Sequence, residues 1–494
     1  MEEDQQSFLK WAGELGVSDS TSTDQLQDPL SCLGHSLCVS HFPQAGGRGL
    51  CAVRDLRKGE LILRVPKSAL LTSQSVMNDK KLSVAVNKHP SLSSTQILTV
   101  CLLYEMGKGK KSKWHPYLIH LPRTYDILAT FGEFEKQALQ VDDARWVTEN
   151  AVLKAQLNWK EANALIEDLK LKPQFLTFRA WLWATATISS RTLHIPWDEA
   201  GCLCPVGDLF NYAAPGKELV GIEDGESCLP NHPSHVTSSS DRGDMAIVDV
   251  KQFDPPFHRL TDGGFEETID AYCFYARENY RTGEQVLLCY GTYTNLELLE
   301  HYGFLLDENP NNKVFIPLGA PVYSSSSWPK QSLYIHHNGK PSYALLSALR
   351  LSATPQNKRR SVGHLAYSGS QLSADNENFV MKFLSKKCSD LLKNLPTSIE
   401  EDIVLLSAMD SQDLSSLLEL RKVLSYADEI CNFMEANNLR DGEGDTDLEI
   451  SRKTKKYMDR WRLAVEWRIK YKQVLVDCIL YCTEVINSLS KILQ

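Results

Sequence analysis

The stretch LLCYGTYTNLELLEHYGFLL, residues 287–306, changes its pattern twice along its length. It starts as an apolar run typical of a β-strand, breaks at Tyr290-Gly291, and continues as a short helix that ends at Tyr302-Gly303. Two tyrosines, each followed directly by a glycine, therefore flank one helix. Tyrosines often close a strand or a core for packing reasons alone, so the rest of the chain has to decide whether this pair has a chemical role.

The composition is that of an ordinary soluble globular protein, with 43% hydrophobic and 23% charged residues. The 494 residues are enough for two or three domains. A net charge of -9 argues against direct binding of nucleic acid, because it leaves phosphate repulsion unbalanced. No apolar run reaches the ~18 residues that a membrane span needs, so no membrane association is expected.

The start of the chain, Met1-Glu2-Glu3-Asp4, is acidic. Secretory and plastid targeting segments are basic or poor in acidic residues, so neither a signal peptide nor a transit peptide is expected. The 13 cysteines are an odd number in a long chain, which indicates reduced thiols and not a disulfide framework. These features predict a protein of the cytoplasm, the nucleus or both.

Local patterns divide the chain into strand-rich and helical parts. Glycines separate short alternating runs over residues 37–71, which predicts a small β meander. Helical spacing takes over from about residue 80 to 190. After an apolar run that reaches Asn211, residues 216–266 are rich in Gly, Ser, Pro and His, which predicts a flexible surface loop.

The second half of the chain begins with strands and ends with helices. Two strand-like runs occupy residues 269–291, with Thr282-Gly283-Glu284 as the predicted turn between them. Residues 399–494 have helical patterns, interrupted by an acidic connector at 440–449. Two adjacent apolar rows on the last helix predict a helix that is buried on a broad face, as in a bundle.

Two familiar binding patterns are weak here. GRGLCA, residues 47–52, fits the glycine pattern of dinucleotide folds, but that pattern works only where a strand precedes it and a helix starts on it. A strand and its turns follow instead. A zinc cluster is also disfavoured, because Cys-x-Cys and His-x-x-His are not the usual zinc spacings. Its candidate ligands would be Cys202, Cys204, Cys228, His232 and His235.

The order of motifs along nearly the whole chain resembles the SET-domain methyltransferases, specifically the class of the Rubisco large-subunit methyltransferase. The motifs that carry this resemblance are GGRGLCAVRDLRKGELILRVP (46–66), SKWHPYLIHLP (112–122), TISSRTL (187–193), DLFNY (208–212), GEQVLLCYG (283–291) and HYGF (301–304). Any one of them alone would be weak evidence. Together they are specific.

The resemblance implies an α+β fold: a β-rich SET domain split by a helical insertion, followed by an all-helical C-terminal substrate-binding domain. The expected boundaries are an N-terminal helical segment at 1–34, a SET domain at 35–315 and a helical domain at 316–494. Within the SET domain, the insertion is expected at about 80–190 and the loop at about 216–266.

The resemblance also implies S-adenosylmethionine as the cofactor. The backbone at Gly47 and Arg48 would hold its methionine end, and Arg191 would pair with its carboxylate through the two-pronged guanidinium. Asn211 would bond its amino group or its adenine. Tyr212 and Tyr290 complete the expected cofactor-binding set, and no metal is expected.

Tyr290, Tyr272 and Tyr302 match the three active-site tyrosines of the family. Methyl transfer to nitrogen is an in-line displacement by a neutral amine, so orientation dominates. A lysine, with its pKa near 10.4 in water, must lose a proton first, and an apolar channel favours that loss. We expect Tyr290 to be the central catalytic residue and the other two tyrosines to line the channel, where Gly291 and Gly303 let the backbone approach closely.

One position departs from the family pattern, because Tyr212 follows Asn211 where the family usually has histidine. Cofactor binding is expected to survive, since the main chain of that residue is thought to serve the cofactor. The alternative is a catalytically inactive SET fold that acts as a protein-binding module.

The expected reaction is N-methylation of a protein substrate, with lysine as the favoured acceptor. Histidine is the alternative acceptor, because members of the class use it. Histone and non-histone substrates are both open, and the chain is expected to act as a monomer.

Overall fold

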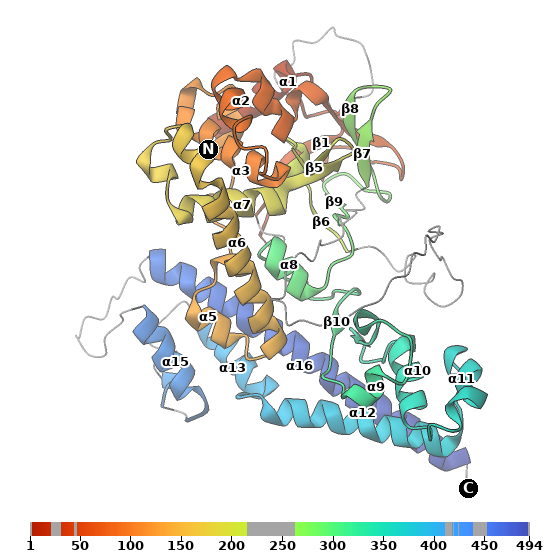
Figure 1. Cartoon of the computed structure of the whole chain (residues 1–494). Coiled ribbons are helices and arrows are strands. Elements are labelled where there is room, and N and C mark those ends of the chain that lie inside the picture. The colour runs from red at the N-terminus through yellow and green to blue at the C-terminus, as the bar shows by residue number, and fades with distance from the viewer. Residues whose placement is uncertain are drawn as a thin grey trace, which may run out of the picture. The chain divides into compact units, whose positions relative to one another are not determined.

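The computed structural model describes residues 2–20, 31–43, 47–214, 262–410, 417, 419–422, 424–437 and 452–492 (Figure 1). The chain consists of two compact units. Unit 1 contains Met1–Phe8, Leu71–Thr192 and Tyr293–Gln494, and unit 2 contains Leu9–Leu70 and Leu193–Thr292. Helix α1 (Glu2–Glu14) opens the chain.

The first sheet of unit 2 brings three of the sequence motifs together. Its strand order is β1–β2–β9–β6, with β1 (Leu37–Phe42), β2 (Gly47–Ala52), β9 (Gln285–Leu288) and β6 (Asn211–Tyr212). β2 is antiparallel to both β1 and β9, whereas β6 runs parallel to β9. The strand that leads to Tyr290 therefore lies between the glycine-rich strand and the strand of Asn211.

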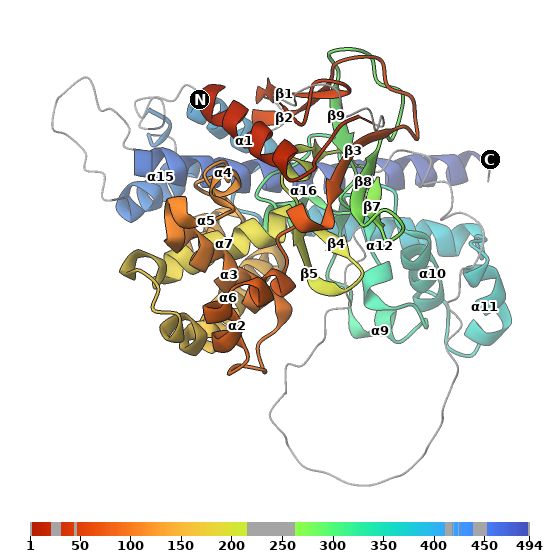
Figure 2. The ribbon, with the colours of Figure 1, turned by 90° about the horizontal axis from the view of Figure 1, so that it is seen from above.

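A second sheet of unit 2 has the antiparallel order β3–β8–β7 (Figure 2). Its strands are β3 (Leu61–Pro66), β8 (Ala271–Tyr275) and β7 (Gly263–Glu266). β4 (Thr192–Ile195) and β5 (Asp198–Leu203) form a further pair. β8 is the central strand of its sheet, and its side chains are almost all buried.

Two pairing predictions from the sequence are wrong. β3 does not continue a meander with β1 and β2 but pairs with β8, and β8 and β9 lie in different sheets, so Thr282-Gly283-Glu284 does not close a hairpin. Turn chemistry predicts where a chain reverses, whereas long-range contacts decide which strands pair. The loop predicted at 216–266 is wrong at its end, because residues 263–266 form β7, and residues 215–261 lie outside the described part.

Unit 1 contains the helices that the sequence predicts from about residue 80 to 190. Helix α3 begins with a capping box, in which the Ser93 hydroxyl accepts from the Gln96 N–H and the Gln96 side chain accepts from the Ser93 N–H. Helices α3, α6 and α7 pack against one another. The helices are α2 (Lys80–Val86), α3 (Ser94–Lys108), α4 (His115–Leu118), α5 (Glu133–Ala138), α6 (Asp142–Asp168) and α7 (Phe178–Arg191).

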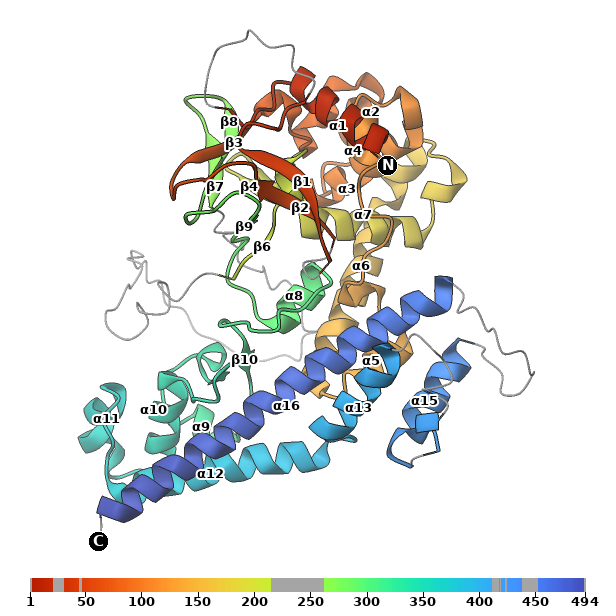
Figure 3. The ribbon, with the colours of Figure 1, turned by 180° about the vertical axis from the view of Figure 1, so that it is seen from behind.

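The rest of unit 1 is built on the long helix α16 (Arg452–Ile492), which runs alongside α12 (Ala374–Asn394) and α13 (Ile399–Asp410) (Figure 3). The predicted acidic connector at 440–449 lies outside the described residues. In the described part of the chain, no helix combines the length and the apolar composition needed to cross a membrane. The other elements are α8 (Asn295–His301), β10 (Lys313–Val314), α9 (Ala320–Tyr323), β11 (Ile335–His336), α10 (Tyr343–Ser352), α11 (Arg359–Tyr367) and α15 (Leu424–Ala436).

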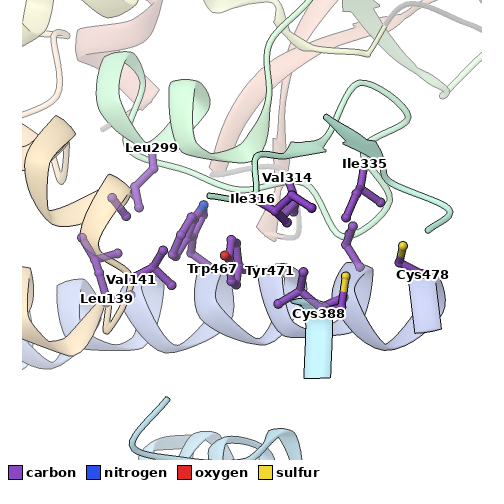
Figure 4. Close-up of a cluster of buried hydrophobic side chains, with 14 of the residues drawn as sticks. Leu139, Val141, Leu299, Val314, Ile316, Ile335, Cys388, Trp467, Tyr471 and Cys478 are labelled. Carbon is purple, nitrogen blue, oxygen red and sulfur yellow. The ribbon is translucent and has the colours of Figure 1, made fainter. Parts of the chain in front are cut away.

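One apolar cluster joins these elements of unit 1 (Figure 4). Trp467 and Tyr471 stand on α16, one helical turn apart, and contribute to the cluster together with Leu299 of α8 and Val314 of β10. The two adjacent apolar rows predicted on the last helix are both buried, because helices and the two-stranded β10–β11 sheet pack against α16.

A buried ionic network crosses the same bundle. Asp402 accepts hydrogen bonds from Arg468 at 2.7 and 3.0 Å and from Lys472 at 2.5 Å, and the Asp402 and Arg468 side chains are fully buried. Arg468 also donates to the carbonyl oxygen of Ala138 at 2.8 Å. Buried charges are tolerated where each one is paired and hydrogen-bonded, as here. The network joins α13 and α16 to the end of α5.

Candidate active site

The glycine-rich strand β2 fits closely against the side chains of Asn211 and Gln285. A Cβ atom at Gly49 would come within 2.6 Å of Asn211 Nδ2 and 2.8 Å of Gln285 Nε2, so a larger residue would displace both amides. Asn211 Nδ2 also donates a hydrogen bond to the carbonyl oxygen of Arg48 at 3.3 Å. Gly47 has a φ of +106°, which also favours glycine. Three predicted cofactor-binding residues, Gly47, Arg48 and Asn211, therefore lie together.

Gln285, whose side chain lies beside Gly49 of β2, is a polar residue that the sequence analysis missed. Its Nε2 atom is buried and has no hydrogen-bond partner among the described residues. A buried amide without a partner is costly, and such groups are often completed by a bound ligand or water. The amide lies beside the glycine-rich strand, so this part of unit 2 fits a polar ligand such as a nucleoside-type cofactor. An alternating strand pattern alone does not distinguish such a residue from a solvated glutamine.

Tyr212 and Tyr290 hold each other's strands through hydrogen bonds to the main chain. The Tyr212 hydroxyl donates to the carbonyl oxygen of Gly291 at 2.8 Å, and the Tyr290 hydroxyl donates to the carbonyl oxygen of Phe210. Their ring centroids are 5.3 Å apart, with planes inclined by 48°. Each phenol therefore bonds to a carbonyl within two residues of the other tyrosine, and these bonds hold the turn after β9.

The turn that carries Tyr290 needs its glycine for a conformational reason. Gly291 has a φ of +144°, which residues with a Cβ rarely adopt. The N–H of Cys289 donates to the carboxylate of Asp262 at 2.8 Å, which anchors the other end of the turn. The sequence prediction that Gly291 allows a close backbone approach to a channel stays a prediction.

Tyr272 lies on β8 and belongs to an aromatic row of unit 2. Its ring centroid is 4.9 Å from that of Phe274, which is 5.2 Å from that of Phe210. Phe210 is the residue whose carbonyl holds Tyr290, so the row links the two tyrosines indirectly. Tyr272 is only 1% exposed, and its ring is tightly packed. Whether it borders a substrate channel stays a prediction.

Arg191 is the last residue of α7 in unit 1. Two residues earlier, the Ser189 hydroxyl donates to the carbonyl oxygen of His301 at 3.0 Å. His301 ends α8 and directly precedes Tyr302. Ser189 of the TISSRTL motif therefore ties the helix of Arg191 to the helix of Tyr302.

Tyr302 caps the C-terminus of α8, as the sequence predicts for the end of this helix. Its hydroxyl donates to the hydroxyl of Tyr293 at 3.2 Å, and the two rings meet edge to face at 5.3 Å. The following Gly303 has a φ of +77°, and a Cβ there would lie 2.9 Å from the carbonyl carbon of Asp126. Tyr293 was missed, although it stands in the same quoted stretch three residues after Tyr290.

Arg460 of α16 supports the segment against which Gly303 packs. Its guanidinium donates to the Asp126 carboxylate at 2.8 Å, to the Thr130 carbonyl at 2.6 Å and to the Tyr125 carbonyl at 3.3 Å. The C-terminal helix thus reaches the Tyr302-Gly303 turn through one buried arginine. No local sequence pattern could reveal this contact, because its partners are separated by more than three hundred residues.

The predicted site residues therefore fall into two groups. Unit 2 brings together Gly47, Arg48, Asn211, Tyr212 and Tyr290, with Tyr272 connected through the aromatic row. Unit 1 holds Arg191 and Tyr302 on two helices that are joined by a hydrogen bond. The convergence of all three tyrosines on one channel stays a prediction.

The disfavoured zinc cluster has two described members, Cys202 and Cys204, both fully buried. Burial raises the pKa of both thiols, which opposes the thiolate form that zinc binds. Among the described residues, no group of histidine, cysteine and acidic side chains is placed to hold a metal ion. Cys228, His232 and His235 lie outside the described residues.

Comparisons with known proteins point to one family. The family model described as Rubisco LSMT substrate-binding matches residues 297–475. The Arabidopsis thaliana protein SET DOMAIN GROUP 40 is 56% identical over 490 residues, covering 98% of this chain and 96% of that protein. The human actin-histidine N-methyltransferase is 26% identical over 448 residues, covering 83% of this chain and 64% of that protein.

Solved structures resemble the fold over nearly the same span. The SET domain of LSMT bound to lysine and AdoHcy matches with a TM-score of 0.59 at 20% identity, covering 99% of this chain and 94% of that one. Rubisco LSMT bound to AdoMet matches with a TM-score of 0.54 at 19% identity, covering 99% and 93%. These likenesses show a common fold.

Proposed function

Because the chain belongs to the SET-domain methyltransferase family, in the class of the Rubisco large-subunit methyltransferase, we propose that it is an S-adenosylmethionine-dependent protein N-methyltransferase. Lysine is the acceptor that we favour. One observation carries the proposal above the others: the glycine-rich strand, Asn211 and the Tyr290 turn lie on neighbouring strands of one sheet and bond to one another.

The residues present fit the cofactor. The main chain of Gly47 and Arg48, with the Asn211 amide, forms one polar edge, and the partnerless amide of Gln285 lies beside it. Arg191 is proposed to pair with the cofactor's carboxylate, since a guanidinium matches two oxygens. When bound, S-adenosylmethionine supplies a methyl group on a sulfonium, and the new N–C bond forms as the S–C bond breaks.

The hydrogen bond that Tyr290 makes determines what its hydroxyl can do for an acceptor. Its proton is directed to the Phe210 carbonyl, so its oxygen presents lone pairs. These can accept a hydrogen bond from the N–H of the incoming amine and so orient the nitrogen lone pair for in-line attack. Tyrosine rings around the amine would exclude water and lower the pKa of the lysine.

The acceptor is the finer part of this proposal. Lysine is favoured because solved neighbours hold lysine or monomethyllysine. Histidine is the second candidate, because relatives with 26% identity are named actin-histidine N-methyltransferases. The match to a substrate-binding family model supports a protein and not a small molecule as the substrate. The presence of Tyr212 in place of the family histidine favours the remaining alternative, a SET fold that binds proteins without transferring methyl groups.

Tritium-labelled S-adenosylmethionine and fractionated cell extract test the proposal. We expect a labelled protein band, and acid hydrolysis of that band should give methyllysine. Methylhistidine in that hydrolysate would instead identify histidine, the second candidate, as the acceptor. Tyr290→Phe should lose labelling but keep cofactor binding in calorimetry, whereas Arg191→Ala should weaken cofactor binding.

The binding module is the outcome that would replace the enzyme. Absence of cofactor binding by the parent protein in calorimetry, together with absence of label in every fraction, would establish it. If Tyr290→Phe methylates as fast as the parent, the role given to that hydroxyl is wrong.

A further inference from the structure

A small cavity of about 70 Å³ opens inside unit 1, between the start of α6, the segment around β10, and α16. Six of its eleven lining residues fall within residues 297–475, two lie just before that range, and the three of the α6 start lie outside it. Most of the lining is apolar, and Trp467 and Tyr471 of α16 stand on the side that faces β10 (Figure 4). The lining residues are Val141, Asp143, Ala144, Thr294, Leu296, Asn312, Lys313, Val314, Phe315, Trp467 and Tyr471.

Two aromatic side chains of the cavity carry polar groups without protein partners. The rings of Trp467 and Tyr471 are stacked at 5.5 Å with planes inclined by 28°, and they are only 6% and 9% exposed. Neither the Trp467 indole N–H nor the Tyr471 hydroxyl makes a hydrogen bond to any residue in the described part of the chain. Buried tyrosine and tryptophan side chains usually find a partner for these groups. A polar group of a ligand would supply one.

The cavity lining has two charged side chains, Asp143 and Lys313. Asp143 lines the cavity and has no cationic partner among the described residues, whereas the neighbouring Asp142 pairs with Arg145 at 3.4 Å. Asp143 and Tyr471 both line the cavity, and burial, followed by the charge of Asp143, raises the pKa of Tyr471. The one lysine of the lining, Lys313, holds its ammonium over the Tyr334 ring, 4.4 Å from the centroid.

Apolar walls, a phenol oxygen and an acid without a cation are together suited to one kind of side chain. The methylene stem of a lysine or arginine fits apolar walls, and its cationic end needs acceptors such as a carboxylate and a phenol oxygen. The aromatic ring faces also favour a cation. The free indole N–H can donate to a peptide carbonyl of the same segment.

We propose that this cavity binds a lysine or arginine side chain of the substrate protein, at a residue other than the one that receives the methyl group. The proposal rests on the proposed function, since it assigns the cavity to recognition of the same substrate. It makes Trp467, Tyr471 and Asp143 determinants of which protein is methylated.

The binding step is measured on the full chain labelled with ¹⁵N at tryptophan, without cofactor. The probe is N-acetyl-arginine amide, and the Trp467 indole signal is assigned by its loss in Trp467→Phe. We expect the probe to shift that signal with millimolar affinity. N-acetyl-norleucine amide and N-acetyl-glutamate amide should shift it at least about fivefold more weakly, because charge-assisted hydrogen bonds are stronger than neutral ones.

Matched variants assign the effect to the cavity. Asp143→Asn should weaken arginine binding about fivefold or more, whereas Asp142→Asn, on the adjacent residue outside the lining, should leave it within twofold. Tyr471→Phe should weaken it as well. Equal binding of the three probes, or equal behaviour of the two aspartate variants, would overturn the proposal.

An enzymatic measurement separates this proposal from the proposed function. With the labelled substrate protein, Asp143→Asn should raise KM and leave kcat and cofactor affinity unchanged. Arginine-probe binding by a protein that methylates nothing would contradict the proposed function and leave the cavity assignment standing. A fully active Asp143→Asn enzyme with an unchanged KM would contradict the cavity assignment alone.

Discussion

The hydroxyl of Tyr212 donates a hydrogen bond to the carbonyl oxygen of Gly291 at 2.8 Å. Gly291 directly follows Tyr290, whose own hydroxyl bonds to the carbonyl of Phe210, two residues before Tyr212. The residue that departs from the family pattern therefore has a specific partner in the turn of the proposed catalytic tyrosine. We propose that this contact positions the Tyr290 turn, which would make a tyrosine at position 212 compatible with an active enzyme.

Removal of the Tyr212 hydroxyl is expected to slow methyl transfer. Tyr212→Phe keeps the ring contact with Tyr290 but leaves the Gly291 carbonyl without this donor, which costs about 1 kcal/mol of positioning free energy. We expect kcat to fall roughly fivefold to tenfold. Calorimetry should show cofactor affinity within twofold of the parent. Steady-state kinetics on the labelled substrate protein measures kcat.

Tyr280→Phe is the matched control. Tyr280 is also a buried tyrosine, and its hydroxyl donates at 3.3 Å to the carbonyl of Leu287 on β9, the strand that leads to Tyr290. No described hydrogen bond joins its side chain to the Tyr290 turn itself. It should change stability and leave kcat unchanged. If both variants lose kcat equally, the effect is a general loosening of β9 and not a positioning role of Tyr212.

Arg460 is expected to influence catalysis from the C-terminal helix. It holds the Tyr125–Thr130 segment, against which Gly303 packs beside Tyr302. Arg460→Lys keeps the charge but cannot reproduce the fork of donors. We expect kcat/KM for the protein substrate to fall about tenfold, with the largest part in kcat.

Arg462→Lys is the control for this prediction, because Arg462 pairs with Glu466 at 2.8 Å on a more exposed side of the same helix. It should have wild-type kinetics. Wild-type kinetics of Arg460→Lys as well would show that the Tyr302 turn keeps its geometry without this arginine.

Much of the fold was predictable because motif order and helical periodicity are local properties. The predicted α+β class, a SET domain split by a helical insertion and followed by a helical substrate-binding domain, is confirmed by the structure and its neighbours. The predicted end of the helix between Tyr290 and Tyr302 is correct, because Gly303 adopts the left-handed conformation that ends helices. The predicted domain boundaries, and a location in the cytoplasm or nucleus, stay predictions.

The strand pairings and the supporting contacts were not predictable in the same way. β3 and β8 are separated by about two hundred residues, and nothing in either strand identifies the other. Gln285, Phe210 and Arg460 act through a buried amide, a main-chain carbonyl and a long-range ion pair. Such roles depend on tertiary placement and not on residue type, so a single sequence carries no signal for them.

The glycine at position 49 is expected to be essential for the cofactor side of the site. Gly49→Ala would place a Cβ 2.6 Å from Asn211 Nδ2 and 2.8 Å from Gln285 Nε2, so both amides would have to move. We expect calorimetry to show cofactor affinity reduced at least tenfold, while circular dichroism stays that of the parent. Gly264→Ala is the control, because a Cβ there meets no atom within 4 Å. Equal cofactor affinities of the two variants would contradict a role of this strand in cofactor binding.

Asp79 is expected to make the stability of unit 1 depend on pH. Its carboxylate caps α2 by accepting from the N–H groups of Lys81 and Leu82, and it pairs with Lys108 at 2.8 Å. Burial raises the pKa of Asp79, but the bonds from Lys108 and the helix N–H groups outweigh burial, so the pKa is lowered overall. The stabilisation is therefore complete above the unfolded-state pKa of about 3.9 and is lost as the pH falls through the folded-state pKa.

Urea unfolding of the parent and of Asp79→Asn at several pH values tests this. At pH 7 the variant should be less stable by roughly 1 kcal/mol, because asparagine can still cap the helix but cannot pair with Lys108. The difference should shrink toward zero as the pH is lowered below about 4, since the parent's carboxylate then becomes protonated and is uncharged like the asparagine. Asp142→Asn, whose carboxylate makes only an exposed pair with Arg145, should have a smaller effect at pH 7. A difference between parent and Asp79→Asn that stays constant down to acidic pH would mean that the cap acts through its shape and not through its charge.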